Sequence, residues 1–252
     1  MEFIFVFSTG RSGTALLAQY FGGVFKNKYT WNYRDNIAIA HEPFDELEEY
    51  SQAIKDIKQG KDPKVAGFLL RELEKNKKCD KYLITDNKLG RWFWDDFCRE
   101  GIKIRMIYLL RNERDVVRSL QHTFPNGIFW GYQPTDANSL VDRTLPPPWY
   151  HVKETSAQWI KIREKLASDQ YIEISFERFL KEKAERERLQ NFVRISGYDN
   201  LLKHRINTHI PFFGMAGYGD KRKSMKKMVL EVIGSIFKRV LISGRFQDIG
   251  KS

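Results

Sequence analysis

Apolar and polar residues follow two alternating patterns along this chain. Short, continuously apolar runs are typical of strands buried on both faces of a sheet, and they occur at 3–7, 82–85, 104–110 and 171–175. Segments with helical character lie at 14–21, 92–99, 113–120, 152–166, 176–180 and 184–195. Because strands that alternate with helices pair in parallel, the pattern predicts an α/β fold, a parallel sheet with helices on both faces.

One long segment, residues 122–151, breaks this pattern. Its turn-forming residues exclude a long regular element, and they include Pro125, Gly127, Gly131, Pro134 and the prolines at 146–148. It also carries aromatic residues, namely Phe129, Trp130, Tyr132, Trp149 and Tyr150. Long irregular segments in compact domains are often functional, so we interpret it as an ordered lid or wall of a binding site. The alternative is a surface excursion whose rings pack against the domain.

The composition is that of a globular protein. Of 252 residues, 42% are apolar, 14% aromatic and 30% charged, which excludes a disordered, collagen-like or low-complexity chain. No apolar stretch approaches the roughly 18–20 residues that span a bilayer, and the N-terminus lacks the basic segment of a signal peptide. We therefore expect a cytoplasmic protein with reduced thiols at Cys79 and Cys98, folded as a single domain over residues 1–252.

The charge of the chain is unusual. A formal net charge of +11 favours a polyanionic partner, such as nucleic acid, membrane headgroups or a phosphorylated ligand. Nine basic residues and two acidic residues lie between 221 and 252. Apolar residues at helical spacing predict a basic helical segment near 221–245. It either docks on the core or makes a peripheral contact with a membrane surface.

The sharpest local signal lies between the first strand and the first helix. It reads Ser8-Thr9-Gly10-Arg11-Ser12-Gly13-Thr14. Glycines let the backbone wrap an anion closely, hydroxyls and free amides donate to it, and a guanidinium suits phosphate or sulfate. A plain strand-to-helix turn would explain Ser12 or Thr14 alone. An ATP-binding P-loop would carry a lysine that this loop lacks, which argues against a kinase.

A second phosphate-type pattern follows the strand at 104–110. Arg111 ends that strand, and Ser119 comes eight residues later, about two helical turns on. Together the two patterns resemble the sulfotransferases that use 3′-phosphoadenosine 5′-phosphosulfate (PAPS). In that family a Lys/Arg-Ser-Gly-Thr core grips the 5′-phosphosulfate, and an arginine and a serine eight apart grip the 3′-phosphate. Arg11 in the lysine position resembles the carbohydrate and bacterial branches.

The resemblance implies a P-loop-like sheet and assigns the donor site. The 5′-phosphosulfate would be held by Gly10, Arg11, Ser12, Gly13 and Thr14, and the 3′-phosphate by Arg111 and Ser119. Some members close the 3′-phosphate site with a late Arg-Lys-Gly, which Arg222 and Lys223 match in part, with Ser224 in place of the glycine. The sulfuryl donor would be PAPS, the product 3′,5′-ADP, and no metal would be required.

Sulfuryl transfer also needs a base and cations. The resemblance points to Glu42 as the base, and His41 is the rival because histidine titrates near neutral pH. Alternatively both lie in an exposed loop, and His122 or His151 would then serve. Lys88 matches a family lysine that contacts the transferring group, with Asn87 as its neighbour; the alternative is a solvated surface lysine.

The sequence thus predicts a sulfotransferase that moves a sulfuryl group from PAPS to a hydroxyl of a small-molecule or carbohydrate acceptor. The segment 124–150 would set the choice of acceptor, and no nucleic-acid partner is expected. Two alternatives stay open: a P-loop-type kinase acting on a small molecule, and a basic nucleic-acid- or membrane-binding module.

Overall fold

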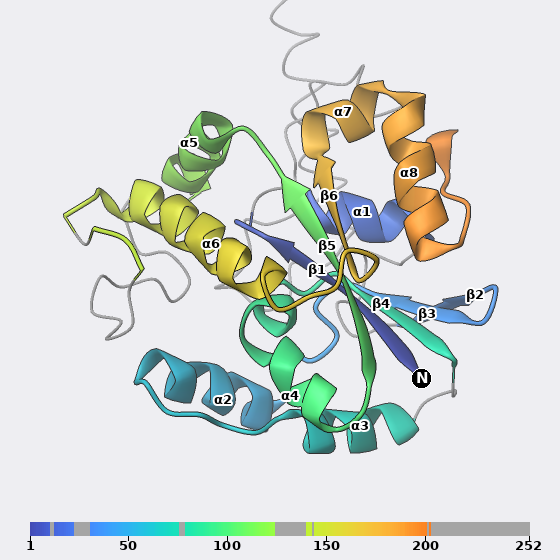
Figure 1. Cartoon of the computed structure of the whole chain (residues 1–252), viewed down its shortest axis with the longest axis horizontal. Coiled ribbons are helices and arrows are strands. Elements are labelled where there is room, and N and C mark those ends of the chain that lie inside the picture. Colours follow the sequence, from blue (N-terminus) through green and yellow to red (C-terminus); the bar gives the residue numbers. More distant parts are fainter. Residues whose placement is uncertain are drawn as a thin grey trace, which may run out of the picture. The chain divides into compact units, whose positions relative to one another are not determined.

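The computed structural model describes residues 1–10, 13–22, 31–75, 79–123, 140–142, 144–200 and 202. These residues contain a six-stranded sheet with the order β2-β3-β4-β1-β5-β6 (Figure 1). The strands are β1 (Glu2–Ser8), β2 (Asn32–Arg34), β3 (Ile37–Ala40), β4 (Lys81–Ile84), β5 (Lys103–Leu110) and β6 (Tyr171–Ser175). All neighbours pair in parallel except β2 and β3, which are antiparallel. The predicted α/β class is confirmed.

Helices cover both faces of the sheet. They are α1 (Thr14–Tyr20), α2 (Glu48–Lys58), α3 (Ala66–Glu74), the π-helix η1 (Leu89–Phe93), α4 (Trp94–Arg99), α5 (Glu113–Thr123), α6 (Pro147–Arg163), α7 (Phe176–Lys181) and α8 (Lys183–Val193). Figure 1 shows α2, α3 and α4 on one side of the sheet and α1, α7 and α8 on the other. None of the described helices combines the length and the apolar character that a membrane crossing requires.

Strand β1 separates two hydrophobic cores by the alternation of its side chains. Phe3, Phe5 and Phe7 pack into the core under α2, α3 and α4, whereas Ile4 and Val6 pack into the core under α1, α7 and α8. Side chains of successive strand residues point to opposite faces, so a strand buried on both faces must be apolar at every position. This is the physical reason for the uninterrupted apolar run at the start of the chain.

The irregular part of the segment 122–151 is shorter than the sequence predicts. Helix α5 continues to Thr123, and α6 begins at Pro147, with proline in its first turn. A proline at the first helical position loses no hydrogen bond, because the N–H groups there have no partner within the helix. The prolines that we took to exclude a helix therefore begin one. Residues 124–139 and 143, like the basic segment near 221–245, lie outside the described residues.

The connections between strands place a switch point beside β1. After β1 the chain runs to β2 and β3 on one side of the sheet centre, whereas after β5 it runs to β6 on the other side. The strands β1 and β5 are hydrogen-bonded neighbours, so the point between them is a topological switch point. Ligands of open α/β sheets bind at the carboxyl ends of the strands beside such a point.

Candidate active site

The sequence-predicted site residues meet at one edge of the sheet. The parallel strands β1, β3, β4, β5 and β6 all end at this carboxyl edge, so the residues that follow them lie along it. The loop after β1 leads to Gly13, the loop after β3 begins with His41 and Glu42, and Lys88 and Arg111 follow β4 and β5. The fold thus brings together segments that are far apart in the sequence.

Two glycines of the loop after β1 have a left-handed backbone. Gly10 and Gly13 both lie in the left-handed region, with φ of 68° and 89°. Ser8 fixes the start of the loop: its N–H donates to Asn87 Oδ1 at 2.9 Å, and its Oγ accepts the Gly10 N–H at 3.1 Å. Thr14 begins α1 as predicted, while Arg11 and Ser12 lie outside the described residues.

Phe176 joins this loop to the end of β5. A Cβ on Gly13 would lie 2.8 Å from both Cδ2 and Cζ of the Phe176 ring, and closer still to Cε2. The Arg111 guanidinium lies over the same ring, with its Cζ 5.3 Å from the ring centroid. One aromatic ring therefore lies beside both segments that the sequence predicts to bind phosphate.

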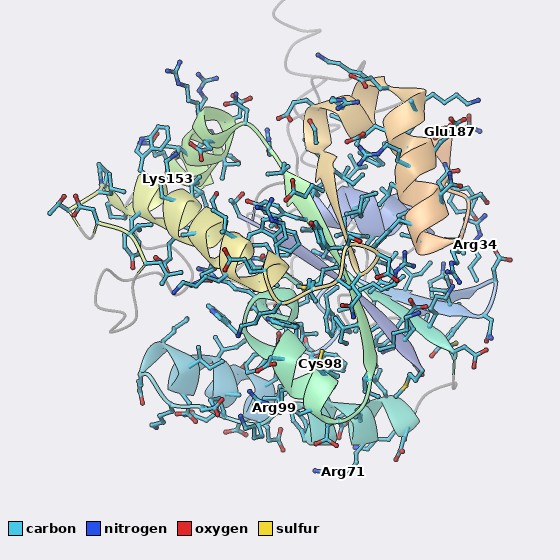
Figure 2. All side chains as sticks on the ribbon, in the orientation of Figure 1. Arg34, Arg71, Cys98, Arg99, Lys153 and Glu187 are labelled. Carbon is cyan, nitrogen blue, oxygen red and sulfur yellow. The ribbon has the colours of Figure 1, made fainter. Side chains whose placement is uncertain are left out.

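Helix α5 carries the rest of the second motif. Asn112 caps its N-terminus, because its Oδ1 accepts the N–H groups of Arg114 at 3.0 Å and Asp115 at 3.3 Å. Ser119 is half-buried on this helix, and Arg114 is exposed. Lys153 of α6, labelled in Figure 2, forms an ion pair with Glu113 at the start of α5, with 2.7 Å between Nζ and Oε2. Arg222 and Lys223 lie outside the described residues.

His41 and Glu42 are buried, so the interpretation of an exposed loop is wrong. Only 6% of His41 and 9% of Glu42 are exposed. The Thr85 carbonyl oxygen lies 3.0 Å from His41 Nδ1 and can only accept, so Nδ1 carries the proton and Nε2 is the basic nitrogen. That Nε2 lies 3.9 Å from Glu42 Oε2. Glu42 itself has a φ of 49°, a left-handed conformation that is uncommon outside glycine and typical of functional turns.

Lys88 lies among carboxylates rather than in solvent. Its Nζ forms an ion pair with Asp45, and it lies 5.9 Å from the ring centroid of Tyr50. Asp86 is fully buried and accepts the Tyr50 hydroxyl at 2.9 Å. Burial disfavours the ammonium ion, yet the negative charges of Asp86, Asp45 and Glu42 outweigh burial and raise the pKa of Lys88. The interpretation of a solvated surface lysine is therefore wrong.

Asp45 has a raised pKa in this cluster. Burial and the negative charges of Asp86 and Glu42 raise the pKa of Asp45 from 3.8 to about 7, against the opposing charge of Lys88. Several carboxylates lie near one ammonium ion in a largely buried environment, so ionising all of them carries a high electrostatic free energy. Asp45 therefore takes up a proton near neutral pH.

A second layer of polar residues lies behind the loop. His151 of α6 is buried, and its Nε2 lies 2.6 Å from the Thr9 carbonyl oxygen. Burial and the positive charge of Arg91 lower the pKa of His151 from 6.5 to about 3. A ring with so low a pKa is a poor proton acceptor at neutral pH, so His151 is not the reserve base that the sequence suggested. His122 is exposed on α5.

Sequence reasoning missed several residues of this edge. Asp86 had a visible signal, because Thr85-Asp86-Asn87-Lys88 is a polar cluster directly after a buried strand. Asp45, Arg91 and Phe176 had none, since their partners come from segments between 43 and 163 residues away. The described residues contain no group of three or more His, Cys, Asp or Glu side chains that is arranged to hold a metal ion.

Comparison with known proteins gives structural matches alone. No protein-family model matches the chain, and no curated protein matches it. A sulfotransferase domain from the curacin biosynthetic pathway is 15% identical, with a TM-score of 0.43 over 79% of this chain and 75% of that one. A sulfotransferase domain from the Synechococcus PCC 7002 olefin synthase is 14% identical, with a TM-score of 0.45 over 80% and 76%.

A third solved structure has a similar level of likeness. The sulfotransferase from Alicyclobacillus acidocaldarius is 14% identical, with a TM-score of 0.47 over 77% of this chain and 81% of that one. At this identity the likeness concerns the fold, and the activity has to be argued from the residues of the carboxyl edge. The three matched structures are sulfotransferases.

Proposed function

We propose that the chain is a PAPS-dependent sulfotransferase that acts on a hydroxyl group of a small-molecule or carbohydrate acceptor. One observation carries the proposal. The loop with Gly10 and Gly13 follows β1, Arg111 follows the neighbouring strand β5, and both lie at the carboxyl edge of the sheet beside the switch point. Two separate anion sites on adjacent strands suit a donor that carries a 3′-phosphate and a 5′-phosphosulfate.

The residues of the edge fit this donor. Among the described residues, no heavy atom lies within 4 Å of where a Cβ on Gly10 would stand, so Gly10 would let a ligand approach the backbone closely. The Gly10 N–H is donated to Ser8, so the amides that follow it up to Thr14, with Arg11 and Ser12, would hold the 5′-phosphosulfate, and Arg111 and Ser119 the 3′-phosphate. Arg222 and Lys223 stay sequence-based candidates for closing the 3′-phosphate site. When bound, PAPS supplies the sulfuryl group.

Glu42 is the proposed base. Because the Nδ1–H of His41 donates to the Thr85 carbonyl, its Nε2 faces Glu42 and can share a proton that the carboxylate takes from the acceptor hydroxyl. The backbone of Glu42 is in a strained, left-handed conformation at the start of the loop after β3. Lys88 lies within the same electrostatic cluster and would neutralise charge that develops on the transferring group.

Four ligands test the proposal against its alternatives. Purified protein is titrated by calorimetry with 3′,5′-ADP, with 5′-AMP, with ATP and Mg²⁺, and with single-stranded RNA. We expect 3′,5′-ADP to bind at least about ten-fold more tightly than 5′-AMP, because a charged hydrogen bond to the 3′-phosphate is worth roughly 1.5–3 kcal/mol. Tight binding of ATP with Mg²⁺, without a preference for the 3′-phosphate, would indicate a kinase. Binding of RNA alone would indicate a nucleic-acid-binding module.

A transfer assay tests the reaction itself. Protein is incubated with PAPS that carries radioactive sulfate and with panels of phenols, alcohols and oligosaccharides. We expect labelled sulfate ester to accumulate together with an equal amount of 3′,5′-ADP. Release of 3′,5′-ADP without a labelled product from any hydroxyl acceptor would contradict the proposed acceptor class.

A further inference from the structure

Helix α6 is hydrogen-bonded to the loop after β1 through His151. The Thr9 carbonyl oxygen can only accept, so at 2.6 Å the His151 ring must donate its Nε2–H. With a pKa of about 3, caused first by burial and then by the charge of Arg91, the ring is uncharged over the whole ordinary pH range. The donor is therefore present whenever the protein is folded.

This bond fixes the orientation of one peptide group at the entrance of the loop. The C=O and N–H of a trans peptide point in opposite directions. His151 binds the Thr9 carbonyl on one side of the Thr9–Gly10 peptide, and Ser8 Oγ accepts the Gly10 N–H at 3.1 Å on the other. With both ends held, the peptide plane that precedes the left-handed Gly10 is fixed at the entrance of the loop.

A buried guanidinium holds His151 in place. Arg91 lies on the π-helix η1 and is only 5% exposed. Its Nη1 donates to Thr155 Oγ1 at 3.1 Å, and Thr155 Oγ1 in turn donates to the His151 carbonyl at 2.8 Å. Arg91 also donates through Nε to Gln158, one turn further along α6. The Arg91 side chain thus ties η1 to the middle of α6, within one or two turns of His151.

The same helix is bonded to the segment that precedes it. Glu154 Oε2 accepts the Leu140 N–H at 2.8 Å, and Glu154 Oε1 accepts from Gln158 at 2.9 Å. Leu140 lies in the stretch from which the sequence predicts the acceptor wall. Helix α6 therefore connects that stretch with the loop of the proposed donor site, and His151 is the contact with the loop.

We propose that His151 is a positioning residue for the proposed donor site: its bond to the Thr9 carbonyl sets the loop amides for the 5′-phosphosulfate. The inference rests on the proposed function for the identity of the ligand. It predicts that loss of the donor weakens recognition of the 5′ group and spares recognition of the 3′-phosphate. A histidine that merely satisfies a buried carbonyl would weaken both to the same extent, through the stability of the fold.

The test compares His151→Leu with His151→Gln. Leucine removes the donor, whereas the side-chain amide of glutamine can place an N–H near the position of Nε2. A matched control is Trp159→Phe, a buried change on α6 that removes the Nε1–H bond to Glu173 and leaves the bond from His151 to Thr9 in place. Affinities for 5′-AMP, 3′-AMP and 3′,5′-ADP are measured by calorimetric displacement, and melting temperature reports the stability of each variant.

We expect His151→Leu to weaken 5′-AMP and 3′,5′-ADP about ten-fold, the usual effect of one buried hydrogen bond, and to change 3′-AMP less than about two-fold. His151→Gln should recover most of the loss, and Trp159→Phe should leave the ratio of 5′-AMP to 3′-AMP affinity unchanged. Equal losses for 5′-AMP and 3′-AMP, or no loss in His151→Leu, would overturn the inference while leaving the proposed function intact.

Hydrogen exchange separates the inference from the proposed function. Without nucleotide, the backbone amides of residues 8–17 should exchange faster in His151→Leu than in the unaltered protein, and at the unaltered rate in His151→Gln. Unchanged exchange in His151→Leu would overturn the positioning role. If the unaltered protein binds none of the three nucleotides, the proposed function is wrong, and faster exchange in His151→Leu would still support the link from α6 to the loop.

Discussion

The ring of Phe176 occupies the space where a side chain on residue 13 would begin. A Cβ there would lie 2.8 Å from two ring carbons and closer to a third, and the residue has a φ of 89°. Glycine is required at this position both by its backbone conformation and by a neighbour that comes from the far end of the described chain. At Gly10 the conformation alone imposes the requirement, because nothing lies within 4 Å.

Alanine substitutions at the two glycines should therefore lower the free energy of unfolding by different amounts. Gly10→Ala should destabilise the protein by about 1–2 kcal/mol, the usual cost of a left-handed residue with a side chain. Gly13→Ala should cost more, since the Phe176 ring must also move, and it should weaken 3′,5′-ADP binding as the ring shifts. Urea denaturation gives the free energies of unfolding. Phe176→Leu in the Gly13→Ala background should recover part of the loss; equal costs for the two single variants would contradict the overlap.

Arg111 should govern recognition of the 3′-phosphate. Arg111→Ala should weaken 3′,5′-ADP binding by about 2–4 kcal/mol, because it removes a charged donor to a partly buried phosphate. Binding of 5′-AMP, which lacks that phosphate, should change much less. Arg114→Ala is the control, because Arg114 is an exposed arginine on the same helix. Equal loss of both ligands in Arg111→Ala would mean that Arg111 serves the fold.

Glu42 and His41 can be separated by two nearly isosteric changes. Glu42→Gln keeps the size of the side chain but cannot accept the proton of the acceptor, so turnover should fall by roughly 10²–10⁴. Affinity for 3′,5′-ADP should stay nearly unchanged. His41→Asn keeps an N–H that can donate to the Thr85 carbonyl but removes Nε2, so it should reduce turnover less. Steady-state kinetics with saturating PAPS measures both, and the reverse order would assign the base to His41.

Asp45 should make stability depend on pH. Its pKa is about 7 in the folded protein and 3.8 as its ordinary value, so between about pH 4 and 7 the folded state holds a proton that the unfolded chain has lost. The stabilisation from this proton is complete below pH 4 and is lost as the pH rises through 7. Asp45→Asn should therefore flatten the fall of unfolding free energy with rising pH. Urea denaturation across this range checks it; an identical slope in both proteins would disprove it.

The sequence by itself determined most strands and helices of this protein. The apolar run at 3–7 and the helix that begins at Thr14 were visible because strand burial and helix periodicity leave local patterns. Both patterns that we propose to bind phosphate were also visible, since each lies within a few residues. The missed elements were β2, β3, α2, α3 and the π-helix η1. The two strands are only three and four residues long, too short for a period to show.

The tertiary structure alone decided which residues share the site. Glu42, Asp45 and Lys88 form one electrostatic cluster because β3 and β4 end side by side, and no spacing in the sequence indicates this. The bond from His151 to Thr9 joins residues 142 positions apart. Local patterns record whether a residue is buried or exposed. Strand order and helix packing decide which groups are buried together. Groups buried together shift each other's pKa or fix each other's hydrogen bonds.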